Sequence, residues 1–140
     1  MNKFDNSLGY LLGIAAAINK NELYSVLAPY DITPEQFTLL TKLDINPSKG
    51  KTQRQLAHES YKDEANITRI LKKLELKGYV QKIVDSKDKR NNFVFLTEGG
   101  QNLLNLLQPL IIDYRKQMLK NLSEEEILTM KKMLKRIIED

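Results

Sequence analysis

The apolar residues of this chain change their spacing abruptly at Gly78, and that change constrains the fold more than any other feature. Before Gly78 they recur at positions i, i+3, i+4 and i+7, which places them on one face of a helix. These residues are Ile67, Ile70, Leu71 and Leu74. After Gly78, residues 79–84 and 92–96 have the composition and alternation of β-strands, with a polar segment between them. A helix is therefore expected to lead directly into a β-hairpin.

The starts of several other helices are marked by capping boxes, in which a Thr or Ser is followed three residues later by Gln or Glu. They begin at Thr33, Thr52 and Ser123. Together with the apolar periods, they predict helices over about 4–27, 34–43, 53–59, 64–77, 98–121 and 124–138. Pro109 lies inside the fifth helix and should bend it.

The composition excludes several classes of function. The chain has 140 residues, about the length of one domain, with no cysteine and one histidine. Disulfides, thiol nucleophiles and thiol redox switches are therefore excluded, and no catalytic, metal or cofactor residues are predicted. An enzyme is disfavoured. No apolar run is long enough to span a bilayer and no signal peptide is visible, so a cytoplasmic location is expected.

The positive charge is concentrated in the middle of the chain. The net charge is +4, and residues 46–97 hold 12 of the 22 basic side chains but only 6 of the 18 acidic ones. One-sided charge on one segment is typical of a protein that binds a polyanion such as nucleic acid. The alternative is a solvated face that keeps the protein in solution.

The order of these elements, helix, turn, helix and then a hairpin with a basic tip, predicts a winged helix-turn-helix. The expected fold is mainly α, with about six helices and a two- to three-stranded wing. Residues 33–97 of the single chain 1–140 would form the DNA-binding part. Residues 1–32 and 98–140 carry more apolar positions than one core needs, and they would form a helical dimerisation part.

Five fragments of the sequence, in this order, resemble the MarR family of bacterial transcriptional regulators. They are residues 27–37, 52–57, 67–80, 88–90 with 96–100, and 122–126. The chain differs from the family pattern at three places. Ser60-Tyr61 replaces an apolar residue and glycine, Asp31 replaces a common glycine, and Lys89 replaces the first of two wing arginines.

The candidate DNA contacts lie on the two helices of the motif and at the hairpin tip. They are Thr52, Gln53, Lys62, Ala65, Asn66, Thr68, Arg69, Lys72, Lys73, Lys89 and Arg90. Arg69 is expected to bind a guanine edge or a phosphate. Asn66 has two alternatives, bonding adenine or serving the helix backbone. Each residue also has a plain alternative as a solvated or capping side chain.

The resemblance further implies a ligand site in the crevice between the dimerisation helices and the winged part, where small aromatic effectors would bind. The candidates are Tyr10, Ile14, Phe37, Leu40 and Tyr114, and the alternative is that all five belong to the core.

The function expected from the sequence is that of a homodimeric repressor on a pseudopalindromic operator of double-stranded DNA, released by a ligand. Three alternatives remain open at this stage. They are an architectural DNA binder without an effector, a winged-helix module that binds proteins, and a small enzyme.

Overall fold

The computed structural model describes residues 3–4, 6–84, 87 and 92–139. The described part has six α-helices, a short 3-10 helix and a three-stranded antiparallel sheet, which confirms the predicted fold class. The helices are α1 (Leu8–Leu27), η1 (Ala28–Tyr30), α2 (Pro34–Asp44), α3 (Gln53–Ser60), α4 (Glu64–Leu76), α5 (Glu98–Met118) and α6 (Glu124–Ile138). The strands are β1 (Lys51–Thr52), β2 (Val80–Val84) and β3 (Asn92–Leu96).

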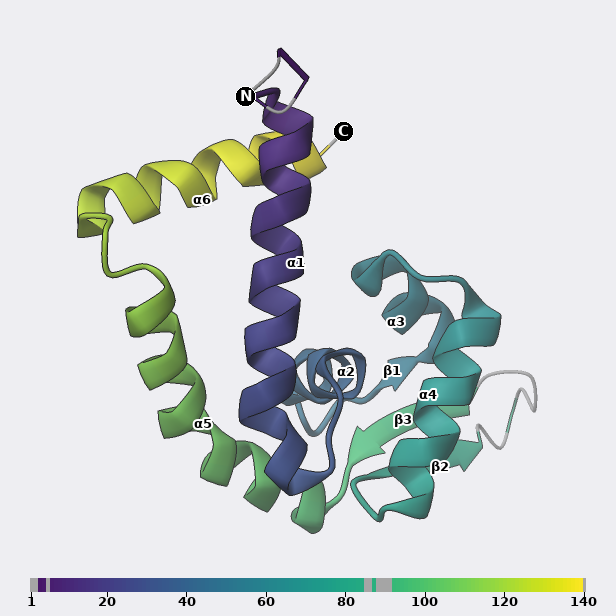
Figure 1. Ribbon diagram of the computed structural model, residues 1–140. Helices are drawn as coiled ribbons and strands as arrows, with labels where there is room; N and C mark the ends of the chain where they lie inside the picture. Colours follow the sequence, from purple (N-terminus) through teal and green to yellow (C-terminus); the bar gives the residue numbers. More distant parts are fainter. Residues whose placement is uncertain (1–2, 5, 85–86, 88–91, 140) are drawn as a thin grey trace.

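The long helix α1 runs through the middle of the molecule, with α5 on one side and α2, α3, α4 and the sheet on the other, while α6 crosses α1 near its N-terminal end (Figure 1). The short helix α2 lies at the centre of the winged part and contacts α1, α3, α4, α5 and β3. Its Leu39, Leu40 and Leu43 are almost completely buried. The core therefore lies around α2 rather than along α1.

The helix starts follow the capping residues. All three predicted capping boxes, at Thr33, Thr52 and Ser123, are formed. The first helix begins at Leu8, not at the predicted Phe4, because the Ser7 hydroxyl accepts a hydrogen bond from the Tyr10 N–H and fixes the start there.

The predicted end of the fifth helix near Asn121 is also wrong. The helix stops at Met118, since Leu119 leaves helical geometry and the next residues form a turn in which the Leu122 N–H donates to the Leu119 carbonyl. Figure 1 shows α5 following a curved path, and Pro109 lies within it.

The sheet has the order β1-β3-β2, and β2 pairs with β3 in the register Val80↔Leu96 to Val84↔Asn92. Strand β1 has only two residues, so no alternation of apolar residues could reveal it. Gly50 allows β1 to lie close to β3. Its φ is +67°, and a Cβ at this position would lie 2.7 Å from the ring of Phe95. A side chain at position 50 would push β1 away from β3.

Among the residues that the structure describes, two other than glycine adopt the left-handed conformation, and they stand at two of the positions where the sequence departs from the family pattern. Asp31 has φ 56° and ends η1, and Tyr61 has φ 54° and ends α3. The turn of the helix-turn-helix therefore keeps a glycine-like backbone although it carries a tyrosine, at a cost of roughly 1–2 kcal/mol for the left-handed residue.

Replacing Tyr61 by Gly is expected to raise the free energy of unfolding by about 0.5–1 kcal/mol. The left-handed strain is relieved, and the greater freedom of glycine in the unfolded chain offsets part of the gain. Urea denaturation followed by circular dichroism measures the change. Tyr61→Ala is the matched control, because it removes the ring but keeps the strain, and it should show no gain. Equal stabilisation by both variants would contradict the explanation.

Candidate DNA-binding surface

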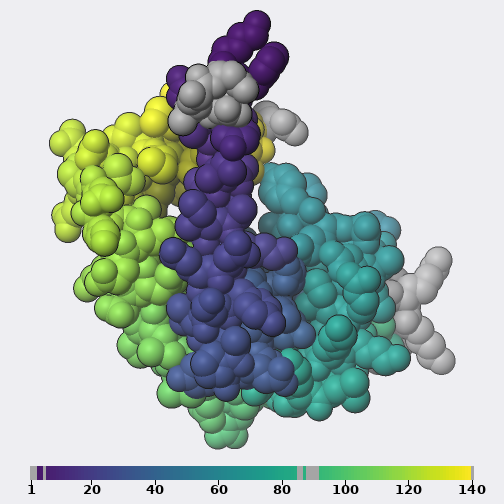
Figure 2. Space-filling view, viewed as in Figure 1, coloured from purple at the N-terminus to yellow at the C-terminus, as the bar shows by residue number. Residues whose placement is uncertain are grey.

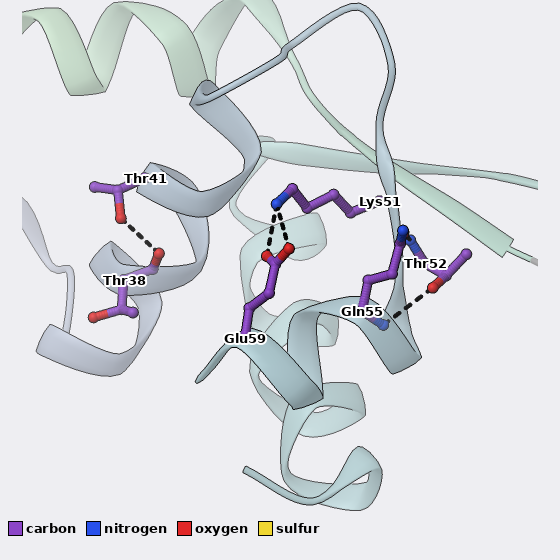
Figure 3. A network of polar contacts seen from close by, with 6 residues as sticks. All are labelled: Thr38, Thr41, Lys51, Thr52, Gln55 and Glu59. Carbon is purple, nitrogen blue, oxygen red and sulfur yellow. Dashed lines mark hydrogen bonds and ion pairs between the residues drawn. The ribbon is translucent and has the colours of Figure 1, made fainter. Parts of the chain in front are cut away.

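Helix α3 is fixed to the sheet at its first residues. The Thr52 hydroxyl accepts the Gln55 N–H at 3.1 Å, and the Gln55 side chain accepts the Thr52 N–H at 2.8 Å. Beside this cap, Lys51 Nζ donates to both carboxylate oxygens of Glu59, at 2.8 and 2.6 Å (Figure 3). Because Lys51 belongs to β1 and pairs with Val94 of β3, this ion pair holds α3 at a fixed position on the sheet.

Helix α4 has the two faces that the apolar period predicts. Ile67, Ile70, Leu71 and Leu74 are buried. The start of the helix is fixed by Asp63, whose carboxylate accepts the Asn66 N–H at 2.7 Å. The remaining faces carry mostly exposed polar and charged side chains, of which Arg69, Lys72 and Lys73 are positively charged.

Nine of the eleven predicted DNA contacts lie in the described part of the chain. Thr52 and Gln53 are at the start of α3, and Lys62 is in the turn before α4. Six are on α4, where Asn66 is half-buried and the others are exposed, namely Ala65, Asn66, Thr68, Arg69, Lys72 and Lys73. Lys89 and Arg90 lie outside the described residues.

Polar contacts link several of these side chains to one another. Arg69 Nη2 donates to Asn66 Oδ1 at 2.5 Å within α4. The Thr68 hydroxyl lies 3.2 Å from Gln53 Oε1, which connects α4 to the start of α3. The surface therefore has a defined arrangement before any partner binds.

The far end of α4 is held by a contact that the sequence did not reveal. Lys77 Nζ donates to the Asp31 carbonyl and lies 3.5 Å from the Asp31 carboxylate and 3.3 Å from Gln36 Oε1. Gln36 is only 4% exposed and belongs to the capping box of α2. Lys77 and Asp31 are 46 residues apart, so only the fold brings them together.

The start of α2 is also tied to α1. Lys20 Nζ lies 2.8 Å from Glu35 Oε1, and this hydrogen bond lowers the pKa of the Glu35 carboxyl, with the positive charge of Lys62 adding to the effect. The pKa of Lys20 is raised by the same bond. Since both side chains are partly exposed, the pair adds little to stability, but it positions α2 between α1 and α4.

A cavity of about 520 Å³ lies between α1, α2 and α5. Its lining combines apolar and polar side chains: Asn19, Leu23, Phe37, Thr38, Thr41, Asp44, Leu104, Asn105, Gln108, Ile111, Ile112 and Arg115. Of the five predicted ligand residues, Phe37 lines this cavity. Leu40 is completely buried, while Tyr10 and Ile14 are exposed on α1.

Tyr114, the fifth predicted ligand residue, is 8% exposed and connects α5 to α1. Its hydroxyl donates to Asn19, with the backbone carbonyl of Asn19 at 3.1 Å and the side-chain amide oxygen also in contact. Burial raises the pKa of Tyr114. The hydroxyl therefore joins two helices and does not line the cavity described above.

The terminal helices carry most of the large apolar side chains that are exposed in the described chain. None of the side chains of α6, a helix described in full, is buried. An apolar groove of about 710 Å³ lies between α1, the end of α5 and α6. Its apolar lining includes Leu12, Ile18, Leu122, Ile127, Met130 and Leu134. Figure 2 shows the surface of α1 uncovered along much of its length on the visible face.

The described residues contain neither a metal site nor a membrane span. No group of three or more His, Asp or Glu side chains could hold a metal ion in the part of the chain described here. Within the same residues, none of the helices has the length and hydropathy needed to cross a membrane.

Comparisons with known proteins identify the fold and the family. Residues 32–91 match the model of the MarR family. The chain is 30% identical over 132 residues to the multiple antibiotic resistance protein MarR of Escherichia coli, covering 94% of this chain and 90% of that protein. It is also 34% identical over 100 residues to the HTH-type transcriptional regulator SarZ of Staphylococcus haemolyticus, covering 70% of this chain and 65% of that one.

Two solved structures with DNA are similar over nearly the whole chain. A mutant of MarR from E. coli in complex with operator DNA has a TM-score of 0.87 at 28% identity, covering 98% of this chain and 99% of that one. The MepR–DNA complex of S. aureus has a TM-score of 0.85 at 26% identity, covering 94% and 96%. The fold and the surface define a winged-helix protein of the regulator class. The chain belongs to the MarR family.

Proposed function

We propose that this chain is a homodimeric transcriptional regulator that represses by binding a pseudopalindromic operator in double-stranded DNA. The observation that carries the proposal is the exposed surface of α4, which carries Arg69, Lys72 and Lys73 and is linked to the capped start of α3 by the contact between Thr68 and Gln53. Two of the solved structures that this chain resembles contain DNA.

In this proposal α4 enters the major groove, which is wide enough for one helix. Thr52 and Gln53 lie at the start of α3, where free backbone N–H groups suit a phosphate. Lys62, Lys72 and Lys73 would bind phosphates, and Arg69 would bind a base edge. Lys89 and Arg90 remain proposed contacts of the wing. In this proposal, residues 33–97 form the DNA-binding part of the chain.

The dimer is supported by the terminal helices, residues 1–32 and 98–140. A single chain leaves α6 without a buried side chain and leaves apolar residues of α1 exposed, such as Leu8 and Ile18. Covering the apolar groove with a second copy removes this surface from water and relates two α4 helices by a two-fold axis. A pseudopalindromic operator has the same symmetry.

Release by a small effector is supported by the cavity between α1, α2 and α5. Its volume of about 520 Å³ is in the range of small-molecule sites. The Thr38 hydroxyl donates to the Pro34 carbonyl, and the Thr41 hydroxyl donates to the Thr38 carbonyl (Figure 3), so each hydroxyl offers a ligand an acceptor oxygen. The apolar part of the lining, together with these acceptors and the other polar side chains, suits an aromatic compound that carries polar groups such as a hydroxyl.

A regulator of this kind acts in the cytoplasm and has no catalytic role. The similarity to the HTH-type transcriptional regulator SarZ supports this part of the proposal.

The proposal is tested by the salt dependence of DNA binding. Lys72→Ala and Lys73→Ala are each expected to reduce the slope of log K against log salt by about 0.9, because one phosphate contact is lost. Fluorescence anisotropy with DNA from the region beside its own gene, between 50 and 200 mM salt, measures the slope. Lys132→Ala, an exposed lysine on α6, is the matched control and should leave it unchanged.

Three outcomes distinguish the alternatives. A footprint confined to one site in that DNA supports an operator. Salt-dependent binding without any sequence preference would indicate an architectural protein. Absence of salt-dependent DNA binding in the wild type would contradict the proposed function and favour a protein-interaction module.

A further inference from the structure

In the contact between Arg69 and Asn66, chemistry fixes which atom donates and which atom accepts. The guanidinium of arginine has only donors, so the Asn66 atom that faces Arg69 Nη2 at 2.5 Å must be the amide oxygen. The two residues are three positions apart on α4 and therefore lie on neighbouring turns of the same face. The amide oxygen of Asn66 is thus engaged before DNA is present.

Asn66 is the better held of the two side chains. It is half-buried in the first turn of α4, and its backbone N–H donates to the Asp63 cap at 2.7 Å. Arg69 is exposed and would otherwise sample many rotamers. The contact therefore restricts the long side chain of Arg69 by attaching it to a residue that the helix cap already fixes.

The Asn66 side chain that holds Arg69 is uncharged, although carboxylates lie on neighbouring elements. Glu35 is paired with Lys20 at 2.8 Å, and Glu64 lies 3.6 Å from Arg54. An amide oxygen holds the guanidinium without cancelling its positive charge, whereas a carboxylate would form an ion pair that competes with DNA. Arg69 also keeps enough free N–H groups to form a bidentate contact with guanine O6 and N7.

The same contact argues against Asn66 as an independent reader of adenine. A bidentate contact with adenine needs the amide oxygen to accept from N6 while the amide N–H donates to N7. That oxygen accepts from Arg69, and although its second lone pair stays free, the contact holds the amide in the orientation that serves Arg69. We propose that Asn66 is a positioning residue that orients Arg69 toward a guanine, so that the two side chains read one base pair as a unit. This inference rests on the proposed function of α4 as the DNA-reading helix.

The test is a double-mutant cycle on a selected DNA duplex. Selection from a randomised duplex library with wild-type protein gives the preferred sequence, and anisotropy gives Kd for that duplex and for duplexes changed at one base pair. The variants are Asn66→Ala, Arg69→Ala and the double variant, with Asn102→Ala on the exposed surface of α5 as the matched control. Thermal denaturation confirms that each variant is folded.

Arg69→Ala is expected to abolish the preference for guanine at one position, a loss of about five- to 150-fold for the selected duplex. Asn66→Ala should weaken the preference at that same position, and it should have no further effect when Arg69 is already alanine. Asn66→Asp keeps the acceptor and removes the amide donor. Because the new carboxylate would pair with the Arg69 guanidinium and compete with DNA, it should weaken the guanine preference as well as the affinity for all duplexes.

The proposal would be overturned if the effects of the two single variants on Kd multiply in the double variant. It would also be overturned if Asn66→Ala loses a preference for adenine at a second position. An unchanged base preference in Arg69→Ala would overturn it too. If the wild type selects no sequence at all, the proposed function fails, and this outcome is distinct from the others.

Discussion

Gly100→Ala is expected to lower the free energy of unfolding by about 3 kcal/mol, at the upper end of the usual cost of overpacking. A Cβ at position 100 would lie 2.2 Å from the Tyr79 carbonyl oxygen and 3.1 Å from Leu96 Cδ2. The Tyr79 carbonyl accepts the Thr97 N–H at 3.1 Å, so it cannot retreat without loss of a hydrogen bond. Helix α5 would have to move away from the wing.

Urea denaturation followed by circular dichroism measures this effect, and the neighbouring glycine provides its control. A Cβ at Gly99 would meet the Gly78 carbonyl oxygen at 3.4 Å and no backbone atom closer. Gly99→Ala should therefore be neutral, or stabilising by up to about 1 kcal/mol through helix propensity. Equal destabilisation by both substitutions would show that the close approach of α5 to Tyr79 is not the cause.

Met130→Asp is expected to convert the proposed dimer into a monomer at micromolar concentration. Met130 lines the apolar groove beside α1, and a two-fold interface would contain the new carboxylate twice. An unpaired charge buried in an interface costs about 3–5 kcal/mol, so operator affinity should fall by about 100-fold or more. Light scattering should give a mass near the 16.2 kDa of one chain.

Thr129→Asp is the matched control for Met130→Asp, since Thr129 is the adjacent exposed residue of α6 and does not line the groove. It should leave the dimer and its operator affinity unchanged. A dimer that persists in Met130→Asp would place the interface elsewhere, and a wild-type protein that is monomeric at this concentration would contradict the dimer itself.

Local sequence signals predicted most of this fold. Capping boxes and apolar periods depend on residues three or four positions apart, so they are visible in the sequence, and they located every α-helix and both strands of the hairpin. Strand β1 was missed because two residues show no period, and its pairing with β3 spans more than 40 positions. The end of α5 was missed since no Gly or Pro marks it.

The polar surface was only partly predictable from the sequence. The period of α4 placed Arg69 and Lys72 on the face opposite the buried stripe, and both are exposed. The bond between Arg69 and Asn66 depends on rotamers, which a sequence pattern does not specify. Lys77 and Asp31 meet only because η1 and the end of α4 pack together in the folded chain. The lining of the cavity likewise depends on how α1, α2 and α5 pack.

Helix α2 contributes to two regions at once. Its later turns supply Thr41 and Asp44 to the cavity, while its first turn contacts Lys20 of α1 and Lys77 at the end of α4. An 11-residue helix is about 16 Å long and behaves as a stiff rod. Because α2 is stiff and its first turn is attached both to α1 and to the end of α4, a rotation of α2 caused at the cavity would also act on these two attachments. The proposed effector site and the proposed DNA-reading helix are thus connected through one short helix.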